Sequence, residues 1–184
     1  AIADRIRGLC EDIASHYAKE GTDSLAALVV LNGAFMFAAD LGRQLVHEST
    51  LEIGTEFISV TTYGSDIKDL DETERHVQVD DTPRSLWGRH VLLIEDIVDQ
   101  GFTIARIQRI LEDEGALSVR ICSLLVKDLD HCSAEVRALR DSLVVDFAGF
   151  RIPDQWVVGY GTDAHGRFRL LPHVCTVDEN LYRG

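Results

Sequence analysis

Three carboxylates follow a short apolar run near the middle of the chain. Val91 to Ile94 is the run, and Glu95, Asp96 and Asp99 come directly after it. Because acids crowded around an anion repel it, sugar hydroxyls or a divalent cation must lie between them. We interpret Glu95 and Asp96 as acceptors for vicinal sugar hydroxyls, and Asp99 as a general base or an acceptor for the reacting group.

The residues after Asp99 suit a phosphate group. Gly101 and Thr103 open a predicted helix whose apolar face is marked by Ile104, Ile107, Ile110 and Leu111. Unpaired amides and the dipole of a first helical turn attract anions, Gly101 permits close approach, and Thr103 offers a hydroxyl. We interpret Asp99, Gln100, Gly101, Phe102 and Thr103 as a phosphate cradle, so that the whole stretch fits a phosphorylated ribose. The alternative is a solvated acidic turn that ends a buried strand.

The elements that position these residues follow from apolar periodicity. Val91–Ile94 is too short for a helix and lacks alternation, so it predicts a strand buried on both faces in a parallel sheet, with the ligand at its carboxyl end. Similar patterns predict strands at 25–31, 51–60, 77–79, 119–126 and 143–147, helices at 2–20, from 35 through 41, from 101 to 114 and at 131–140, and then a loop and a strand after Gly149.

Length and composition limit the class of protein. The chain has 184 residues, 46% hydrophobic, so we expect a single domain over residues 1–184. Its formal net charge of −13 opposes attraction to nucleic acid or to an anionic membrane. No apolar run approaches the roughly 18 residues of a membrane span, and no signal segment opens the chain. Since the sequence begins at Ala1, we expect a residue or a short leader to precede it.

The cysteines and histidines argue against disulfides and structural zinc. Cys10, Cys122, Cys132 and Cys175 lack C-x-x-C spacing, which suits reduced thiols in a cytoplasmic protein. The seven histidines show neither an H-E-x-x-H motif nor pairing with cysteines. We therefore expect any metal to be a hard cation held largely by substrate oxygens.

The central stretch resembles the signature of a known family. It is similar to the phosphoribosyl-diphosphate (PRPP) motif of type I phosphoribosyltransferases, an apolar strand followed by Glu-Asp-x-x-Asp-Thr-Gly-x-Thr. Gln100 stands where Thr is usual, which removes one hydroxyl donor and keeps the amides. The resemblance implies the type I phosphoribosyltransferase fold, a mainly parallel sheet flanked by helices with a small hood, and Mg²⁺ as the cofactor.

A second match lies after the strand predicted at 25–31. The segment LNGAFMFAADL is similar to the pyrophosphate loop of hypoxanthine-guanine phosphoribosyltransferases, commonly L-K-G-S-F-x-F-x-x-D-L. The resemblance assigns Asn32 and Gly33 to pyrophosphate, with Asn32 in place of the usual basic residue. It also implies a non-proline cis peptide at Leu31–Asn32. Taken alone, the pattern also fits a structural turn.

A polar segment at about 61–76 is the third match. Thr62-Tyr63-Gly64 is similar to the Ser-Tyr-Gly of the family's flexible loop, which closes over the active site. Thr62 and Tyr63 would then help to exclude water, because solvent would otherwise capture an oxocarbenium-like sugar. A plain mobile loop is the alternative.

Two later segments resemble the family's purine site. ICSLLVK ends at Lys127, which matches the lysine that donates to the exocyclic oxygen at C6 and so favours a 6-oxo over a 6-amino base. GFRIPDQWVVGYGTD looks like G-F-x-I-P-D-K-F-V-V-G-Y-x-x-D, by which Trp156 stacks on the purine and the backbone of Val157 meets its 2-position edge. Gln155 replaces the usual Lys. The plainer alternatives are a solvated Lys127 and a Trp156 that fills the core.

The resemblance also assigns the cation and the leaving group. Asp163 would help to hold Mg²⁺, together with Glu95 and Asp96. Arg169, in GRFRLLP, matches the arginine that reaches pyrophosphate.

These matches imply an enzyme of purine salvage. PRPP and hypoxanthine or guanine would give IMP or GMP and pyrophosphate, with Asp99 accepting the proton that leaves N7. We expect no nucleic acid or membrane partner, and a homodimer or homotetramer as is usual in the family. Two alternatives stay open: a phosphoribosyltransferase that prefers xanthine, and a catalytically reduced nucleotide sensor that regulates a nucleic acid.

Overall fold

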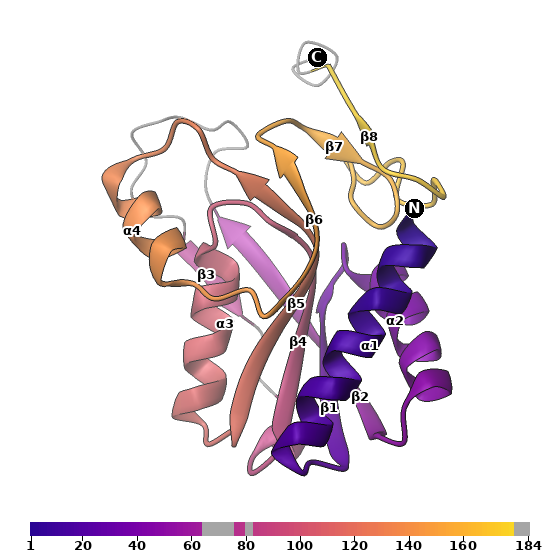
Figure 1. Ribbon diagram of the computed structural model, residues 1–184. Helices are drawn as coiled ribbons and strands as arrows, with labels where there is room; N and C mark the ends of the chain where they lie inside the picture. Colours follow the sequence, from indigo (N-terminus) through magenta and orange to yellow (C-terminus); the bar gives the residue numbers. More distant parts are fainter. Residues whose placement is uncertain (64–75, 80–82, 179–184) are drawn as a thin grey trace.

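The computed structural model describes residues 1–63, 76–79 and 83–178 (Figure 1). Its elements, in chain order, are α1 (Ile2–Glu20), β1 (Ser24–Leu31), α2 (Phe35–Glu48), β2 (Glu52–Tyr63), β3 (His76–Val79), a 3₁₀ turn (Arg84–Leu86), β4 (His90–Val98), α3 (Phe102–Asp113), β5 (Ser118–Asp128), α4 (Ala134–Ser142), β6 (Phe147–Pro153), β7 (Val157–Val158) and β8 (Cys175–Thr176). The predicted helix at 2–20 is confirmed, and Gly21 ends it in the left-handed region at φ 69°.

The central sheet has six strands in the order β3-β2-β1-β4-β5-β6. Every neighbouring pair is parallel except β2 and β3. The mainly parallel sheet predicted from the sequence is therefore confirmed. From β1 the chain continues outward to β2, and from β4 it continues outward to β5 in the opposite direction. The carboxyl ends of β1 and β4 thus form a topological switch point, where open α/β sheets bind their ligands.

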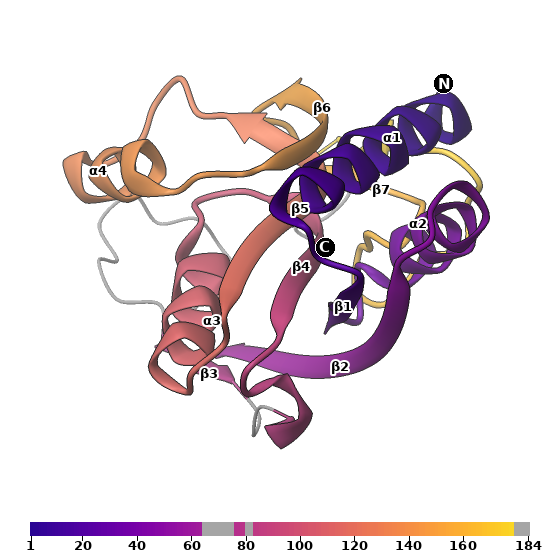
Figure 2. The same cartoon turned by 60° about the horizontal axis from the view of Figure 1, so that its bottom comes forward.

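Helices cover both faces of this sheet. Figure 2 shows α1 and α2 on one side and α3 on the other. Successive residues of the buried strands serve the two layers in turn: Leu25 and Val29 pack with α1 and α2, whereas Leu28 packs with α3. This double burial explains why β1 reads as a continuous apolar run.

Three predicted boundaries differ in the structure. β4 continues to Val98, so Glu95 and Asp96 belong to the end of the strand and not to a loop after it. The strand predicted at 143–147 is wrong, because α4 extends to Ser142 and pairing with β5 begins only at Phe147, which lies opposite Cys122. The partly buried Leu143 packs against the α3 layer as a connector.

The third difference concerns the segment predicted as a loop at about 61–76. β2 continues to Tyr63, which pairs antiparallel with His76 at the start of β3. The short strand predicted at 77–79 is thereby confirmed. The rest of the predicted loop, 64–75, lies outside the described residues. Thr62 and Tyr63 are accordingly at the end of a strand, close to the carboxyl edge of the sheet.

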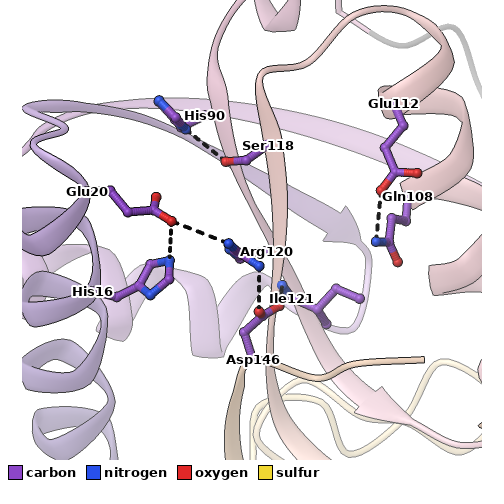
Figure 3. A network of polar contacts seen from close by, with 9 residues as sticks. All are labelled: His16, Glu20, His90, Gln108, Glu112, Ser118, Arg120, Ile121 and Asp146. Carbon is purple, nitrogen blue, oxygen red and sulfur yellow. Dashed lines mark hydrogen bonds and ion pairs between the residues drawn. The ribbon is translucent and has the colours of Figure 1, made fainter. Parts of the chain in front are cut away.

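A polar network ties the opposite, amino-terminal edge of the sheet together (Figure 3). Arg120 on β5 contacts Glu20 of α1 and Asp146 before β6, each at 3.3 Å. Asp146 also accepts a hydrogen bond from the backbone N–H of Ile121 at 2.8 Å. These contacts hold α1, β5 and the approach to β6 in register away from the ligand edge. Within the described ranges, no helix is long and apolar enough to span a membrane.

Candidate active site

A cavity of about 270 Å³ opens at the switch point between β1 and β4. Residues predicted from separate segments line it together: Gly33, Glu95, Asp96, Asp99, Gln100, Gly101, Phe102, Thr103, Asp163 and Arg169. The parallel sheet explains this convergence, because the carboxyl ends of β1 and β4 lie side by side, with Val29 opposite Ile94. Carboxylates, helix amides and an arginine therefore face one space.

The cradle after Asp99 has the geometry that an anion requires. Gly101 is the N-cap of α3 with φ 92°, a backbone conformation that a residue with a Cβ adopts only under strain. A Cβ at this position would also lie 3.0 Å from Leu143 Cδ2. The first-turn amides of α3 begin directly after Gly101 and have no carbonyl one turn earlier within the helix. They are available to an oxyanion at this wall of the cavity.

Glu95 and Asp96 form a buried acidic pair. Their exposed fractions are 7% and 8%. Burial and the neighbouring Asp96 carboxylate raise the pKa of Glu95 well above its usual value. Burial raises the pKa of Asp96 as well, against the lowering effect of Glu95 and Arg169. This environment favours retention of a proton by the pair, and ligands that donate to both carboxylates or neutralise them would release it.

Gly33 lets the loop after β1 approach this pair closely. A Cβ on Gly33 would lie 1.8 Å from Asp96 Oδ2. On its other side, a Cβ on Gly161, whose φ is 108°, would lie 1.9 Å from the carbonyl oxygen of Gly33. The cis peptide implied at Leu31–Asn32 is present. Asn32 itself is exposed and does not line the cavity.

Lys127 links the cavity to an aromatic side chain. Its side chain is 5% exposed, and its ammonium lies 3.4 Å from Asp99 Oδ2 and 3.1 Å from Asp154 Oδ1. It also lies 5.9 Å from the ring centroid of Trp156. An ammonium has three donors, and two of them are directed at these carboxylates. Lys127 is therefore a buried, paired cation and not a solvated charge. Trp156 is only half-buried, so it does not serve simply to fill the hydrophobic core.

The chain after β6 forms the predicted hood. The two-stranded β7–β8 sheet lies above the central sheet near α1 and α2 (Figure 1). Arg169 donates to the Gly161 carbonyl at 2.7 Å and pairs with Asp163 at 2.8 Å. The Tyr160 hydroxyl donates to Asp40 on α2. Arg169 and Asp163 thus reach the cavity from a loop that is tied to α2.

Comparison with known proteins identifies the family of this chain. Residues 1–164 match the phosphoribosyl transferase domain family. The chain belongs to this family. Among its relatives, hypoxanthine phosphoribosyltransferase of Escherichia coli is 36% identical over 94% of this chain and 88% of its own length. Hypoxanthine-guanine phosphoribosyltransferase of Mycobacterium bovis is 34% identical over 99% of this chain and 84% of its own.

Solved structures show the same fold. Hypoxanthine phosphoribosyltransferase from Trypanosoma cruzi, in complex with its product IMP, has a TM-score of 0.80 to this chain at 30% identity, covering 98% of this chain and 91% of its own. The type I phosphoribosyltransferase fold that the sequence predicted is thus confirmed.

The acidic groups of this phosphoribosyltransferase fit a hard cation held partly by substrate. Glu95, Asp96 and Asp163 all line the cavity and offer only oxygen ligands. Among the described residues no group of three or more His, Cys, Asp or Glu side chains could hold a metal alone. Substrate hydroxyl and phosphate oxygens would have to complete the coordination shell.

Residues that sequence reasoning missed support the predicted ones. Asp154 pairs with Lys127, and Asp40 anchors Tyr160 of the hood. Asp154 lies two residues before Trp156, in the I-P-D segment already matched to the family, so its proximity to the base site was a usable signal. The Asp40–Tyr160 contact joins residues far apart in the sequence, and no local pattern indicated it.

We predict that Glu95→Gln stabilises the empty protein at pH 8. The pKa of the Glu95 carboxyl is higher in the folded state than its ordinary value of 4.5, so the stability that this carboxyl contributes is present at low pH and falls as pH rises above 4.5. Gln cannot ionise, so it removes this loss. Chemical unfolding in metal-free buffer measures the gain, which should shrink towards pH 4.5. Glu112→Gln, an exposed carboxyl on α3, is the control, and an equal gain at both pH values would contradict the prediction.

We predict that Gly33→Ala lowers kcat/KM for PRPP by roughly a hundredfold or more, because displacing a reacting group by about 1 Å has an effect of that size. The added methyl group must displace either the loop or the Asp96 carboxylate. Steady-state kinetics measure the loss. Gly42→Ala on α2 is the matched control: its Cβ would meet nothing within 4 Å, so activity should be unchanged and stability higher by about 0.5 to 1 kcal/mol. Native kinetics in Gly33→Ala would show that the contact has no functional role.

Proposed function

We propose that this chain is a purine salvage enzyme that transfers the 5-phosphoribosyl group of PRPP to hypoxanthine or guanine, giving IMP or GMP and pyrophosphate. The named relatives are hypoxanthine or hypoxanthine-guanine phosphoribosyltransferases at 34 to 36% identity. The observation that carries the proposal is the position of Asp99. Its carboxylate begins the anion cradle and also contacts the Lys127 ammonium at 3.4 Å. A phosphate site and a base site therefore share one carboxylate.

Different groups around the cavity are assigned to different parts of PRPP. The amides and hydroxyl of residues 100–103 hold the 5′-phosphate, and Glu95 and Asp96 accept hydrogen bonds from the ribose hydroxyls. Arg169, with the loop at Asn32 and Gly33, faces the pyrophosphate. Residues Thr62 and Tyr63, at the end of β2, belong to the segment that would exclude water on closure.

The base site lies on the side of Asp99 that faces β5. Trp156 stacks on the purine, the backbone of Val157 meets its 2-position edge, and the third donor of Lys127 is directed at the exocyclic oxygen at C6. As N9 bonds to C1′, the bond from C1′ to the pyrophosphate oxygen breaks, and Asp99 accepts the proton from N7. A cation at C6 favours an acceptor there, so 6-oxopurines are selected over adenine.

Mg²⁺ is the proposed cofactor, held by Glu95, Asp96 and Asp163 together with substrate oxygens. When bound, it offsets the charge of the pyrophosphate leaving group. The protein's own contribution is to orient these carboxylates and to hold Arg169 beside Asp163, at 2.8 Å.

One assay tests the proposal. Ultraviolet absorbance follows nucleotide formation from Mg²⁺-PRPP with hypoxanthine, guanine, xanthine and adenine in parallel. We expect turnover with hypoxanthine, guanine or both, and little with adenine. Turnover with xanthine alone would assign a different base, and no turnover with any of the four would refute the enzyme proposal.

We further propose a cytoplasmic homodimer or homotetramer. All four cysteines are free thiols, which suits a reducing compartment. Large apolar side chains such as Phe57 and Trp87 are 57% and 76% exposed, and association would cover surface of this kind. Sedimentation velocity at several protein concentrations distinguishes these assemblies from a monomer.

A further inference from the structure

Helix α4 packs against the phosphate cradle, although nothing in its sequence suggested a link to the site. Figure 1 shows it beside the ligand edge, above α3. A Cβ on Gly101 would lie 3.0 Å from Leu143 Cδ2, 3.4 Å from Arg140 Cδ and 3.9 Å from Leu139 Cδ2. The last turn of α4 and the residue after it therefore form the outer support of the N-cap of α3.

Arg140 continues from this contact to the base site. Its Nη2 donates to the backbone carbonyl of Lys127 at 3.0 Å, and its side chain is only partly exposed. Burial and Arg151 lower the pKa of Arg140, whereas Asp99 acts to raise it. The guanidinium thus lies within electrostatic reach of Asp99 while bonded to the residue that pairs with Asp99.

We infer that Arg140 is a positioning residue that holds the 5′-phosphate cradle and the purine-binding lysine in one register. This inference rests on the proposed function and adds a residue to its machinery. The aliphatic part of the Arg140 side chain supports the Gly101 backbone. Its guanidinium bonds to the Lys127 carbonyl and so fixes the backbone from which the Lys127 side chain extends. The two halves of a nucleotide are bound on either side of Asp99, so one arginine spanning both sites sets the distance between them. Its positive charge also favours an anion at the cradle of a chain whose net charge is −13.

The neighbouring Arg137 provides a matched comparison. It lies one helical turn earlier on α4, is exposed, and lines the outer polar hollow that Arg140 also borders. Replacing either arginine with Met removes the same charge from the same helix. Of these two arginines, Arg140 is the one that approaches Gly101 and donates to the Lys127 carbonyl in the described part of the chain.

Titration calorimetry with two probes tests the inference. IMP carries both the base and the 5′-phosphate, whereas ribose 5-phosphate carries only the phosphate half. We expect Arg140→Met to weaken both by about tenfold, the effect of one hydrogen bond to a charged donor, with a melting temperature close to that of Arg137→Met. Arg140→Lys should recover most of the affinity, because its ammonium can reach the same carbonyl. Arg137→Met should bind both probes like the native chain.

Other results would overturn the inference. If Arg140→Met binds both probes as tightly as Arg137→Met does, Arg140 does not position the site. A lower melting temperature with unchanged affinities would show that its role is structural alone. Weakened IMP with unchanged ribose 5-phosphate would show that Arg140 supports the lysine but not the cradle. Since both probes report binding, the inference is decided even if the native chain shows no turnover, a result that would refute the proposed function alone.

Discussion

Asp99→Asn is expected to lower kcat about 10²- to 10⁴-fold while PRPP affinity changes little, because a general base contributes that much to a proton transfer. Asn has nearly the same shape and can still accept a hydrogen bond from Lys127, which lies 3.4 Å from the native carboxylate. It cannot accept the proton from N7. Pre-steady-state kinetics separates the chemical step from product release, and calorimetry with PRPP measures binding.

The substitution also weakens one of the two ion pairs of Lys127, and Asp154→Asn controls for this effect. Asp154 pairs with the same ammonium at 3.1 Å but does not belong to the cradle. If loss of pairing explained the Asp99→Asn defect, Asp154→Asn would be nearly as slow. We expect a tenfold loss at most, of the order of one partly exposed ion pair. Equal losses of kcat and of PRPP affinity in Asp99→Asn would contradict the assignment of a base.

Lys127→Met is expected to lower kcat/KM for hypoxanthine roughly 10²- to 10³-fold, because the substitution removes a charged hydrogen-bond donor to the base and leaves two carboxylates uncompensated beside it. The native side chain is 5% exposed, and its ammonium pairs with both Asp99 and Asp154. Met fills a similar volume but leaves the two carboxylates without their cation. It also removes the donor assigned to the oxygen at C6.

Base selectivity separates a recognition role from general damage. Loss of the cation should lower hypoxanthine turnover far more than adenine turnover, so the ratio of the two kcat/KM values falls. Lys19→Met, which removes an exposed lysine at the end of α1, is the control for charge removal and should keep the native ratio. An unchanged hypoxanthine-to-adenine ratio in Lys127→Met would mean that another group reads the 6-position.

The fold was predictable where local pattern and environment agree. The apolar runs of β1 and β4, each followed by a turn and an amphipathic helix, are sufficient to indicate a parallel sheet with ligands at the carboxyl ends of its strands. Prediction failed at 143–147, where an apolar run that resembles a strand is the connector from α4. Apolar residues in a connecting segment can also pack against the core. The start of β6 is decided by where pairing with β5 begins, at Phe147 opposite Cys122.

The sequence by itself determined which residues are available to the site: the carboxylates, the glycine of the helix N-cap and the lysine near the end of β5 are encoded by short contiguous patterns. The tertiary structure alone decided the contacts between them. Lys127 pairs with Asp99 because β4 and β5 are neighbours, Gly33 abuts Asp96 because β1 lies beside β4, and Arg140 reaches Gly101 because α4 returns over α3. Such contacts join segments distant in the chain, and their partners depend on strand order, which no local periodicity specifies.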